Sequence, residues 1–135
     1  MELDVPLYLH PRDTAPDQQR AYRGYEGLLG SAWGFGAETA LHTLRLLCSG
    51  LFDELPQVKL ILGHLGEGLP FGLPRVQHRL DNQKPCGRHK MPLTCYFEKN
   101  VYTYTRSMSG RQGRRKAMVF SLPGTSPLKP EPFRS

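Results

Sequence analysis

Cysteine is scarce in this 135-residue chain, and this excludes folds that depend on disulfides or on a cysteine-bound zinc ion. The three cysteines, Cys48, Cys86 and Cys95, are odd in number and show no Cys-x-x-Cys spacing, which indicates reduced thiols and argues against a structural zinc knot. No apolar run approaches the length that spans a membrane. The start, Met1–Asp4, has neither the basic residues nor the apolar core of a secretory signal. We therefore expect a cytoplasmic protein with no membrane partner.

Positive charge is present but unevenly distributed. The formal net charge is +6, and residues 106–135 hold seven Lys or Arg residues against one acid, which leaves residues 1–105 neutral. The tail places its bases among serine, glycine and proline, so it buries too little apolar surface to offset its ordering entropy. We predict one folded domain over 1–105 and a disordered basic Pro/Ser/Gly-rich tail over 106–135. Because the tail lacks interleaved aromatic residues, it supports nucleic acid as a partner only weakly.

Two short apolar segments each lead to a histidine. His10 follows Val5–Leu9, and His64 follows the run that starts at Lys59. Such runs are typical of buried strands in parallel sheets, whose carboxyl ends gather reactive groups in one crevice. A neutral imidazole at His10 is a common metal ligand. For either histidine alone, the competing interpretation is a buried ring bonded to a backbone carbonyl.

Charged side chains follow both histidines closely and suggest a catalytic or ligand-binding site. Glu67 lies three residues after His64 and can accept a hydrogen bond from its imidazole if a helix begins there. Arg12, two residues after His10, can bind a carboxylate.

A long glycine-rich segment over residues 13–35 precedes the clearest helix. Loops of this length usually line or cover a site, and Trp33 and Phe35 could form an apolar wall for an aromatic ligand. The alternative is that both rings bury in the core.

Apolar residues at spacings of three and four predict one helix over 37–55, which Pro56 ends. A short helix is predicted over 73–80, an irregular excursion over 81–97 and a third strand over 100–105. The order strand, helix, strand predicts an α/β fold with parallel neighbours.

Seven motifs follow one another between residues 4 and 105. They are Pro6-Leu-Tyr-Leu-His-Pro-Arg12, Gly30-Ser-Ala-Trp-Gly-Phe35, Glu38-Thr-Ala40, Ser49-Gly-Leu-Phe-Asp53, Lys59-Leu-Ile-Leu-Gly-His-Leu-Gly-Glu67, Leu69-Pro-Phe71 and Asn100-Val-Tyr102. In this order they closely resemble the amidohydrolase-related decarboxylases. That group includes the 2,3-dihydroxybenzoate, γ-resorcylate, salicylate and aminocarboxymuconate-semialdehyde decarboxylases, of which the first three are the most similar.

The resemblance implies a (β/α)8 TIM barrel of the metal-dependent hydrolase type, with one divalent metal, usually zinc and in some members manganese. It implies that His10 is a metal ligand, that His64 is the catalytic histidine and that Glu67 is its polar partner. The implied enzyme is a carboxy-lyase that decarboxylates a small hydroxylated aromatic acid, such as a dihydroxybenzoate or salicylate, without oxidation. Full-length members are expected to form homo-oligomers.

The sequence also departs from the family pattern. It lacks the family's glutamate or histidine pair on the first strand and the aspartate after the last strand. We therefore expect a fragment of about three βα units, with one of about four metal ligands, that is inactive in isolation. Two other functions stay open. One is a metal-dependent hydrolase on the same barrel, in which His64 helps to activate water, and the other is an inactive fragment that binds nucleic acid through its tail.

Overall fold

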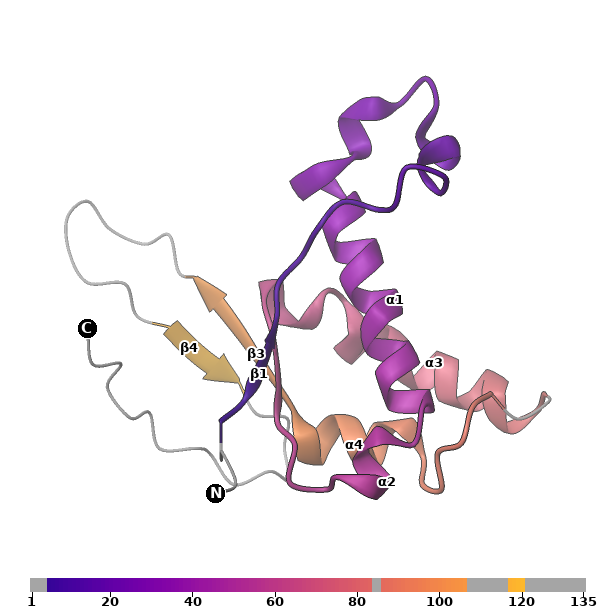
Figure 1. Cartoon of the computed structure of the whole chain (residues 1–135), viewed down its shortest axis with the longest axis vertical. Helices are drawn as coiled ribbons and strands as arrows, with labels where there is room; N and C mark the ends of the chain where they lie inside the picture. Colours follow the sequence, from indigo (N-terminus) through magenta and orange to yellow (C-terminus); the bar gives the residue numbers. More distant parts are fainter. Residues whose placement is uncertain (1–4, 84–85, 107–116, 121–135) are drawn as a thin grey trace.

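A sheet with three parallel strands organises the chain. The computed structural model describes residues 5–83, 86–106 and 117–120 (Figure 1). The sheet order is β1-β2-β3-β4, and its strands are β1 Leu7–Leu9, β2 Leu60–Leu62, β3 Val101–Arg106 and β4 Ala117–Phe120. β1 and β3 both pair in parallel with β2, in a register that aligns Leu9, Leu62 and Thr103. The predicted α/β class and parallel βα units are confirmed, and the third strand is shifted by one residue.

The helices pack against one side of this sheet (Figure 1). They are α1 Gly34–Cys48, α2 Leu51–Glu54, α3 Leu69–Asp81 and α4 Leu93–Asn100. Leu60 and Leu62 of β2 are buried and join one apolar cluster with residues of all four helices. The remaining buried members of that cluster are Leu47, Cys48, Phe52, Leu69, Leu73, Leu93, Tyr96, Phe97 and Val101. The strand period of two places Ile61 on the opposite face, away from this core.

The single helix predicted over 37–55 is wrong, because α1 and α2 are separate helices. Gly50 between them adopts φ +87°, a left-handed conformation that glycine reaches without a steric penalty. The hydroxyl of Ser49 donates to the carbonyl of Leu46 at 2.8 Å and accepts from the backbone N–H of Leu51 at 3.1 Å. The side chain therefore closes one helix and opens the next.

The later helices also differ from the sequence prediction. α3 begins at Leu69 rather than at residue 73, because Pro70 occupies its first turn, where a backbone N–H has no helical partner. The excursion predicted over 81–97 is wrong from Leu93 onward, where α4 begins. The backbone N–H of Leu93 donates to the side-chain oxygen of Gln77 at 2.6 Å. This contact with α3 fixes the start of a helix too short to show a strong period.

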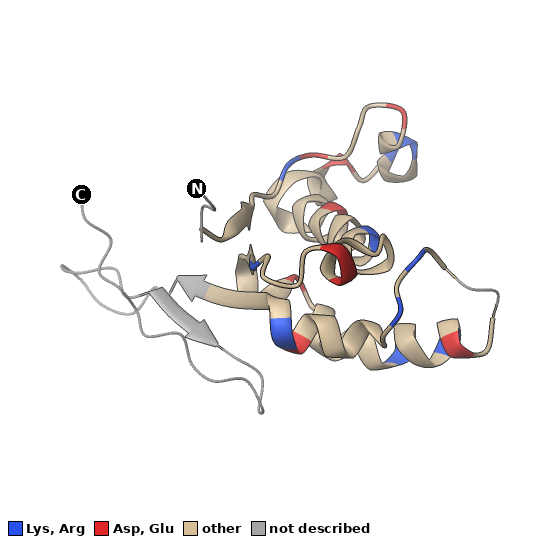
Figure 2. Ribbon diagram, turned by 60° about the horizontal axis from the view of Figure 1, so that its bottom comes forward, with Lys and Arg blue, Asp and Glu red and all other residues tan. Residues whose placement is uncertain are grey.

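Most of the predicted tail lies outside the described residues. Within 106–135, the structure describes Arg106 at the end of β3 and the strand β4, which pairs antiparallel with β3. The domain boundary at 105 and the disorder of the tail stay predictions. In the described part, basic and acidic segments are interspersed over the helices and loops (Figure 2), in keeping with the neutral balance of residues 1–105. Among the described residues, no helix is long and apolar enough to cross a membrane.

Candidate functional site

The two histidines predicted to share a site lie at the same edge of the sheet. His10 directly follows β1, and His64 comes two residues after β2. The two strands are parallel neighbours with Leu9 opposite Leu62, so both chains leave the sheet in the same direction. The prediction of a common edge is confirmed. This is the carboxyl edge, where parallel α/β folds place their active sites.

The turn that carries His64 is left-handed. Every residue from His64 to Gly68 has a positive φ, including the non-glycine residues His64, Leu65 and Glu67 at +46°, +58° and +55°. The sequence suggested the start of a right-handed helix, and the structure corrects this. Non-glycine residues pay a steric cost in this region and gather at functional sites where the surroundings impose the conformation. Gly66 is required here, because a Cβ would lie 2.8 Å from the Thr103 methyl carbon.

The left-handed turn brings His64 and Glu67 together. His64 Nδ1–H donates to Glu67 Oε1 at 2.6 Å, since a carboxylate oxygen can only accept. The Glu67 side chain is 6% exposed and that of His64 is 65% exposed. The carboxylate is thus fixed inside the protein while the ring reaches outward. A hydrogen bond from Nδ1 also selects the ring tautomer, which leaves Nε2 for contact with a ligand.

Helix α1 covers the other side of this carboxylate. A Cβ built on Gly36 would lie only 2.8 Å from Glu67 Oε2, so no larger residue fits there while Glu67 keeps its position. Glycine at this point lets the helix backbone approach the acid closely. The imidazole and the helix together hold the carboxylate from two directions.

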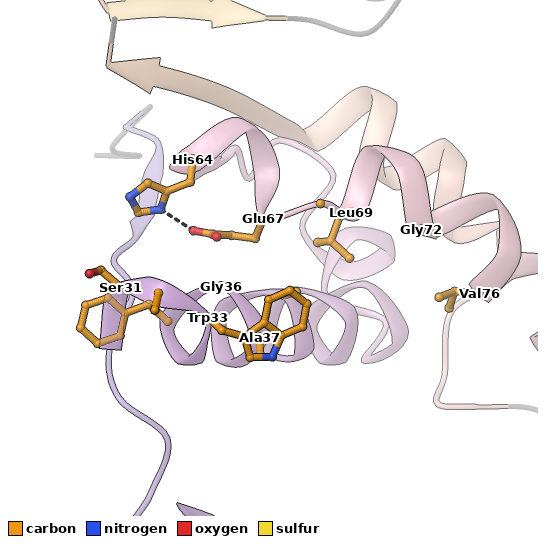
Figure 3. A pocket seen from close by; sticks show the side chains of 13 residues that line it. Ser31, Trp33, Gly36, Ala37, His64, Glu67, Leu69, Gly72 and Val76 are labelled. Carbon is orange, nitrogen blue, oxygen red and sulfur yellow. Dashed lines mark hydrogen bonds and ion pairs between the residues drawn. The ribbon is translucent and has the colours of Figure 1, made fainter. Parts of the chain in front are cut away.

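The His64–Glu67 pair forms the polar wall of a cavity of about 480 Å³. Such a volume accommodates a small organic ligand. Trp33 and Phe35 line the cavity from the start of α1. Leu69 and Val76 of α3 line it from the other side, away from Trp33 (Figure 3). Trp33 is 63% exposed, so burial in the core, the alternative considered for it, is wrong. An apolar cavity with one acid–imidazole pair suits an aromatic ligand that exchanges a proton.

His10 and Arg12 lie in a different hollow. A recess of about 120 Å³ is lined by His10 and Arg12 together with Leu9, Glu38, Thr39 and His42. The structure therefore brings His64, Glu67, Trp33 and Phe35 together, and places His10 and Arg12 in a separate recess. The sequence offered no strong signal for Glu38 and His42. Their spacing of four puts them on one face of α1. Such pairs are common in helices, so the spacing alone did not mark a site.

The ring of His10 is oriented in the way that metal ligands require. Its Nδ1 lies 2.8 Å from the carbonyl oxygen of Pro11, so Nδ1 carries the hydrogen and the neutral ring presents its lone pair on Nε2. Among the described residues, the number of possible metal ligands near His10 is smaller than a catalytic metal site needs. Across residues 5–83, 86–106 and 117–120, no group of three or more His, Cys, Asp or Glu side chains is placed to hold a metal ion.

A tyrosine pair beside His10 was missed from the sequence. The hydroxyls of Tyr8 on β1 and Tyr104 on β3 are 2.6 Å apart, and the ring of Tyr8 meets that of His10 edge-on at 5.9 Å. Burial raises the pKa of Tyr8 to about 12, helped by its bond to Tyr104 and by the charge of Glu67. The neutral phenol therefore persists throughout the physiological range.

Comparisons with known proteins give one consistent result. A family model described as Amidohydrolase matches residues 1–81. A gamma-resorcylate decarboxylase from Polaromonas sp. strain JS666 is 50% identical over 105 residues, which covers 76% of this chain and 32% of that enzyme. This chain therefore spans about a third of the length of the curated relatives it matches.

Solved structures agree with these sequence matches. A crystal structure of dihydroxybenzoic acid decarboxylase from Polaromonas sp. JS666, with bound manganese and the inhibitor 2-nitroresorcinol, matches with a TM-score of 0.70 at 50% identity. The match covers 75% of this chain and 31% of that one. The 5-carboxyvanillate decarboxylase of Sphingomonas paucimobilis matches with a TM-score of 0.66 at 35% identity, over 74% and 30% of the two chains.

Proposed function

Because this chain belongs to the amidohydrolase family, we propose that it supplies the proton-transfer part of a decarboxylase that acts on a hydroxylated aromatic acid such as a dihydroxybenzoate. The observation that carries the proposal is the buried Glu67 carboxylate bonded to His64 Nδ1 at the wall of an aromatic-lined cavity. The similarity to gamma-resorcylate and carboxyvanillate decarboxylases supports it.

His64 is the proposed proton donor. With Nδ1–H held by Glu67, the doubly protonated form of the ring gives the substrate its proton from Nε2. The proton is delivered to the ring carbon that bears the carboxylate. The bond between this ring carbon and the carboxylate carbon then breaks, and the electron pair of that bond restores the aromatic ring as carbon dioxide departs. The neutral imidazole that remains keeps its Nδ1–H bond to Glu67. The carboxylate thus orients the ring before and after the transfer, as a hydrogen-bonded acid does for catalytic and metal-bound histidines.

Trp33 and Phe35 are proposed to hold the aromatic ring of the substrate. Both lie in the cavity that His64 and Glu67 line, and apolar walls exclude water from a ring that must accept a proton on carbon. Arg12 lies with His10 in the separate recess. There its guanidinium is proposed to attract the substrate's carboxylate, for which a planar two-pronged donor is well suited.

A divalent metal is proposed for the complete site, and among the described residues His10 fits the role of a ligand. The hydrogen on Nδ1 leaves Nε2 as the ligand atom. A single imidazole is too few for a catalytic ion, which needs about three protein ligands, and the described residues form no group of three. The other ligands of the complete site set the preference between zinc and manganese. We propose that this chain alone does not retain a metal.

A chimera tests the proposal. Residues 4–105 would replace the matching third of the Polaromonas gamma-resorcylate decarboxylase, and release of carbon dioxide from 2,6-dihydroxybenzoate would be measured with added manganese. We expect activity that His64→Ala abolishes, while Trp33→Ala mainly raises KM. His78→Ala, an exposed histidine on α3 outside the cavity lining, is the matched control. A folded, metal-loaded chimera with equal turnover before and after His64→Ala would refute the proposed role.

A further inference from the structure

The end of α1 and the segment that precedes α4 touch through their backbones. Arg88 N–H donates to the carbonyl of Cys48 at 2.8 Å. A Cβ built on Gly87 would lie 2.0 Å from that carbonyl oxygen and 3.0 Å from the Cβ of Cys48. Gly87 has φ +87°, so both its conformation and its space require glycine. The chain therefore passes directly against Cys48 one residue after Cys86.

Two free cysteines meet at this contact. The backbone contact at Gly87 places Cys86 next to Cys48, whose thiol interacts with the Cys86 side chain. Cys48 is buried and Cys86 is exposed, while Cys95, the third free cysteine, lies on α4 with intermediate exposure. Burial, reinforced by the contact with Cys86, raises the pKa of the Cys48 thiol to about 11. The exposed partner is thus the thiol that a reagent in solution meets first.

We propose that Cys48 and Cys86 form a dithiol site that small disulfides, such as oxidised glutathione, convert to an intramolecular disulfide. The thiolate of Cys86 attacks one sulfur of the reagent, which gives a mixed disulfide and releases one glutathione thiolate. Cys48 then loses its proton and attacks the Cys86 sulfur, and the second glutathione leaves. The two protein thiols are oxidised by two electrons, and one oxidised glutathione becomes two reduced molecules.

The bond would fasten two parts of the fold that the native contacts already hold together. Beyond Cys86, the backbone N–H of Lys90 donates to Asp53 of α2 at 3.0 Å, and the Tyr96 hydroxyl donates to the same carboxylate at 2.5 Å. The disulfide would close a loop that contains β2 and the His64–Glu67 turn. Loop closure of this kind restricts the unfolded chain, so the oxidised protein should unfold at a higher temperature. The inference does not depend on the proposed function.

The test uses the full chain in its native state. The protein would be incubated with excess oxidised glutathione, and remaining thiols would then be alkylated. We expect the mass to show the loss of two hydrogens and the gain of one alkyl group. In a non-reducing peptide map, we expect a Cys48–Cys86 link with Cys95 alkylated. The Cys48→Ser variant should retain one glutathione on Cys86. The Cys86→Ser variant should react at Cys48 at least tenfold more slowly than the parent protein reacts at Cys86. Cys95→Ser is the matched control and should behave as the parent.

The same reaction in guanidinium separates the fold from the sequence. In the unfolded chain, Cys86 and Cys95 are closest in sequence and should pair preferentially, because short loops close most easily. Native pairing with Cys48 therefore reports the folded geometry. A Cys86–Cys95 link in the native protein, or a glutathione adduct on Cys86 that Cys48 does not displace, would overturn the proposal. Neither outcome bears on the decarboxylase chimera.

Discussion

Replacing Glu67 with glutamine tests how the His64–Glu67 pair works. The substitution nearly preserves shape and leaves an oxygen that can accept from Nδ1–H, but it removes the charge. A hydrogen bond to a charged acceptor is worth about 1.5–3 kcal/mol and one between neutral groups about 0.5–1.5 kcal/mol. The midpoints of these ranges differ by about 1.25 kcal/mol, or roughly tenfold in rate if the full difference is felt in the transition state. The acid is 6% exposed, so water does little to screen this loss.

Two measurements follow the effect. In the chimera, turnover of 2,6-dihydroxybenzoate by Glu67→Gln should fall roughly tenfold, within the range usual for groups that orient a reacting histidine. His64→Ala should cost more, since it removes the donor itself. In the 135-residue chain, nitrogen NMR of the His64 ring should show the hydrogen on Nδ1 in the parent and a mixture of the two neutral tautomers in Glu67→Gln.

The control for Glu67→Gln is a chemically identical change away from the cavity. Glu98 is an exposed acid on α4, and Glu98→Gln should leave both the turnover and the His64 tautomer unchanged. The reasoning fails if Glu67→Gln retains full turnover in a folded chimera. It also fails if the His64 ring keeps a single Nδ1–H tautomer after the charge is removed.

Three further predictions concern the supports of the site. Gly36→Ala should push the Glu67 carboxylate away, because the new Cβ would lie 2.8 Å from Oε2. Turnover of the chimera should fall, and combining Gly36→Ala with Glu67→Gln should cause no additional loss. Additive losses would contradict the shared mechanism. Asn100→Ala should lower the free energy of unfolding by about 2 kcal/mol in urea titration, because its amide donates at 2.9 Å to two backbone carbonyls before β2; a change near zero would contradict this. The Tyr96 hydroxyl bond, the largest cause, lowers the pKa of Asp53 below its usual 3.8, so its stabilisation is present above that pH and is lost as the pH falls through the lower folded value. Asp53→Asn should therefore flatten the acid limb of the stability curve below about pH 4, and an unchanged limb would show that the bond is not retained in solution.

Sequence pattern predicted the sheet edge because topology constrains it strongly. Two apolar runs separated by a helix form parallel strands, and parallel strands carry their following residues to one edge. His10 and His64 could therefore be placed together without knowledge of any side-chain contact. The same pattern did not separate their two hollows. The distinction depends on where α1 packs, which puts Trp33 beside His64 and Glu38 beside His10.

Other features could not be predicted because tertiary contacts override local preference. Leu65 and Glu67 adopt left-handed conformations that their residue types disfavour. α4 is eight residues long, too short for its period to stand out, and its buried face becomes apparent only once α3 and β3 are in place. The break at Gly50 was readable from the glycine itself, but the apolar spacing on both sides favoured one continuous helix.

Glycine spacing carries more of the site's specificity than the histidines do. A histidine after a strand is common, whereas this site needs two close backbone approaches that a side chain would obstruct. A Cβ at Gly36 would lie 2.8 Å from Glu67 Oε2, and one at Gly66 would lie 2.8 Å from the Thr103 methyl carbon. These approaches bring α1 and β3 onto the turn after β2, so the acid and the imidazole depend on the same glycines. A chain that keeps His64 and Glu67 but substitutes Gly36 and Gly66 would retain the reactive groups without the geometry that joins them.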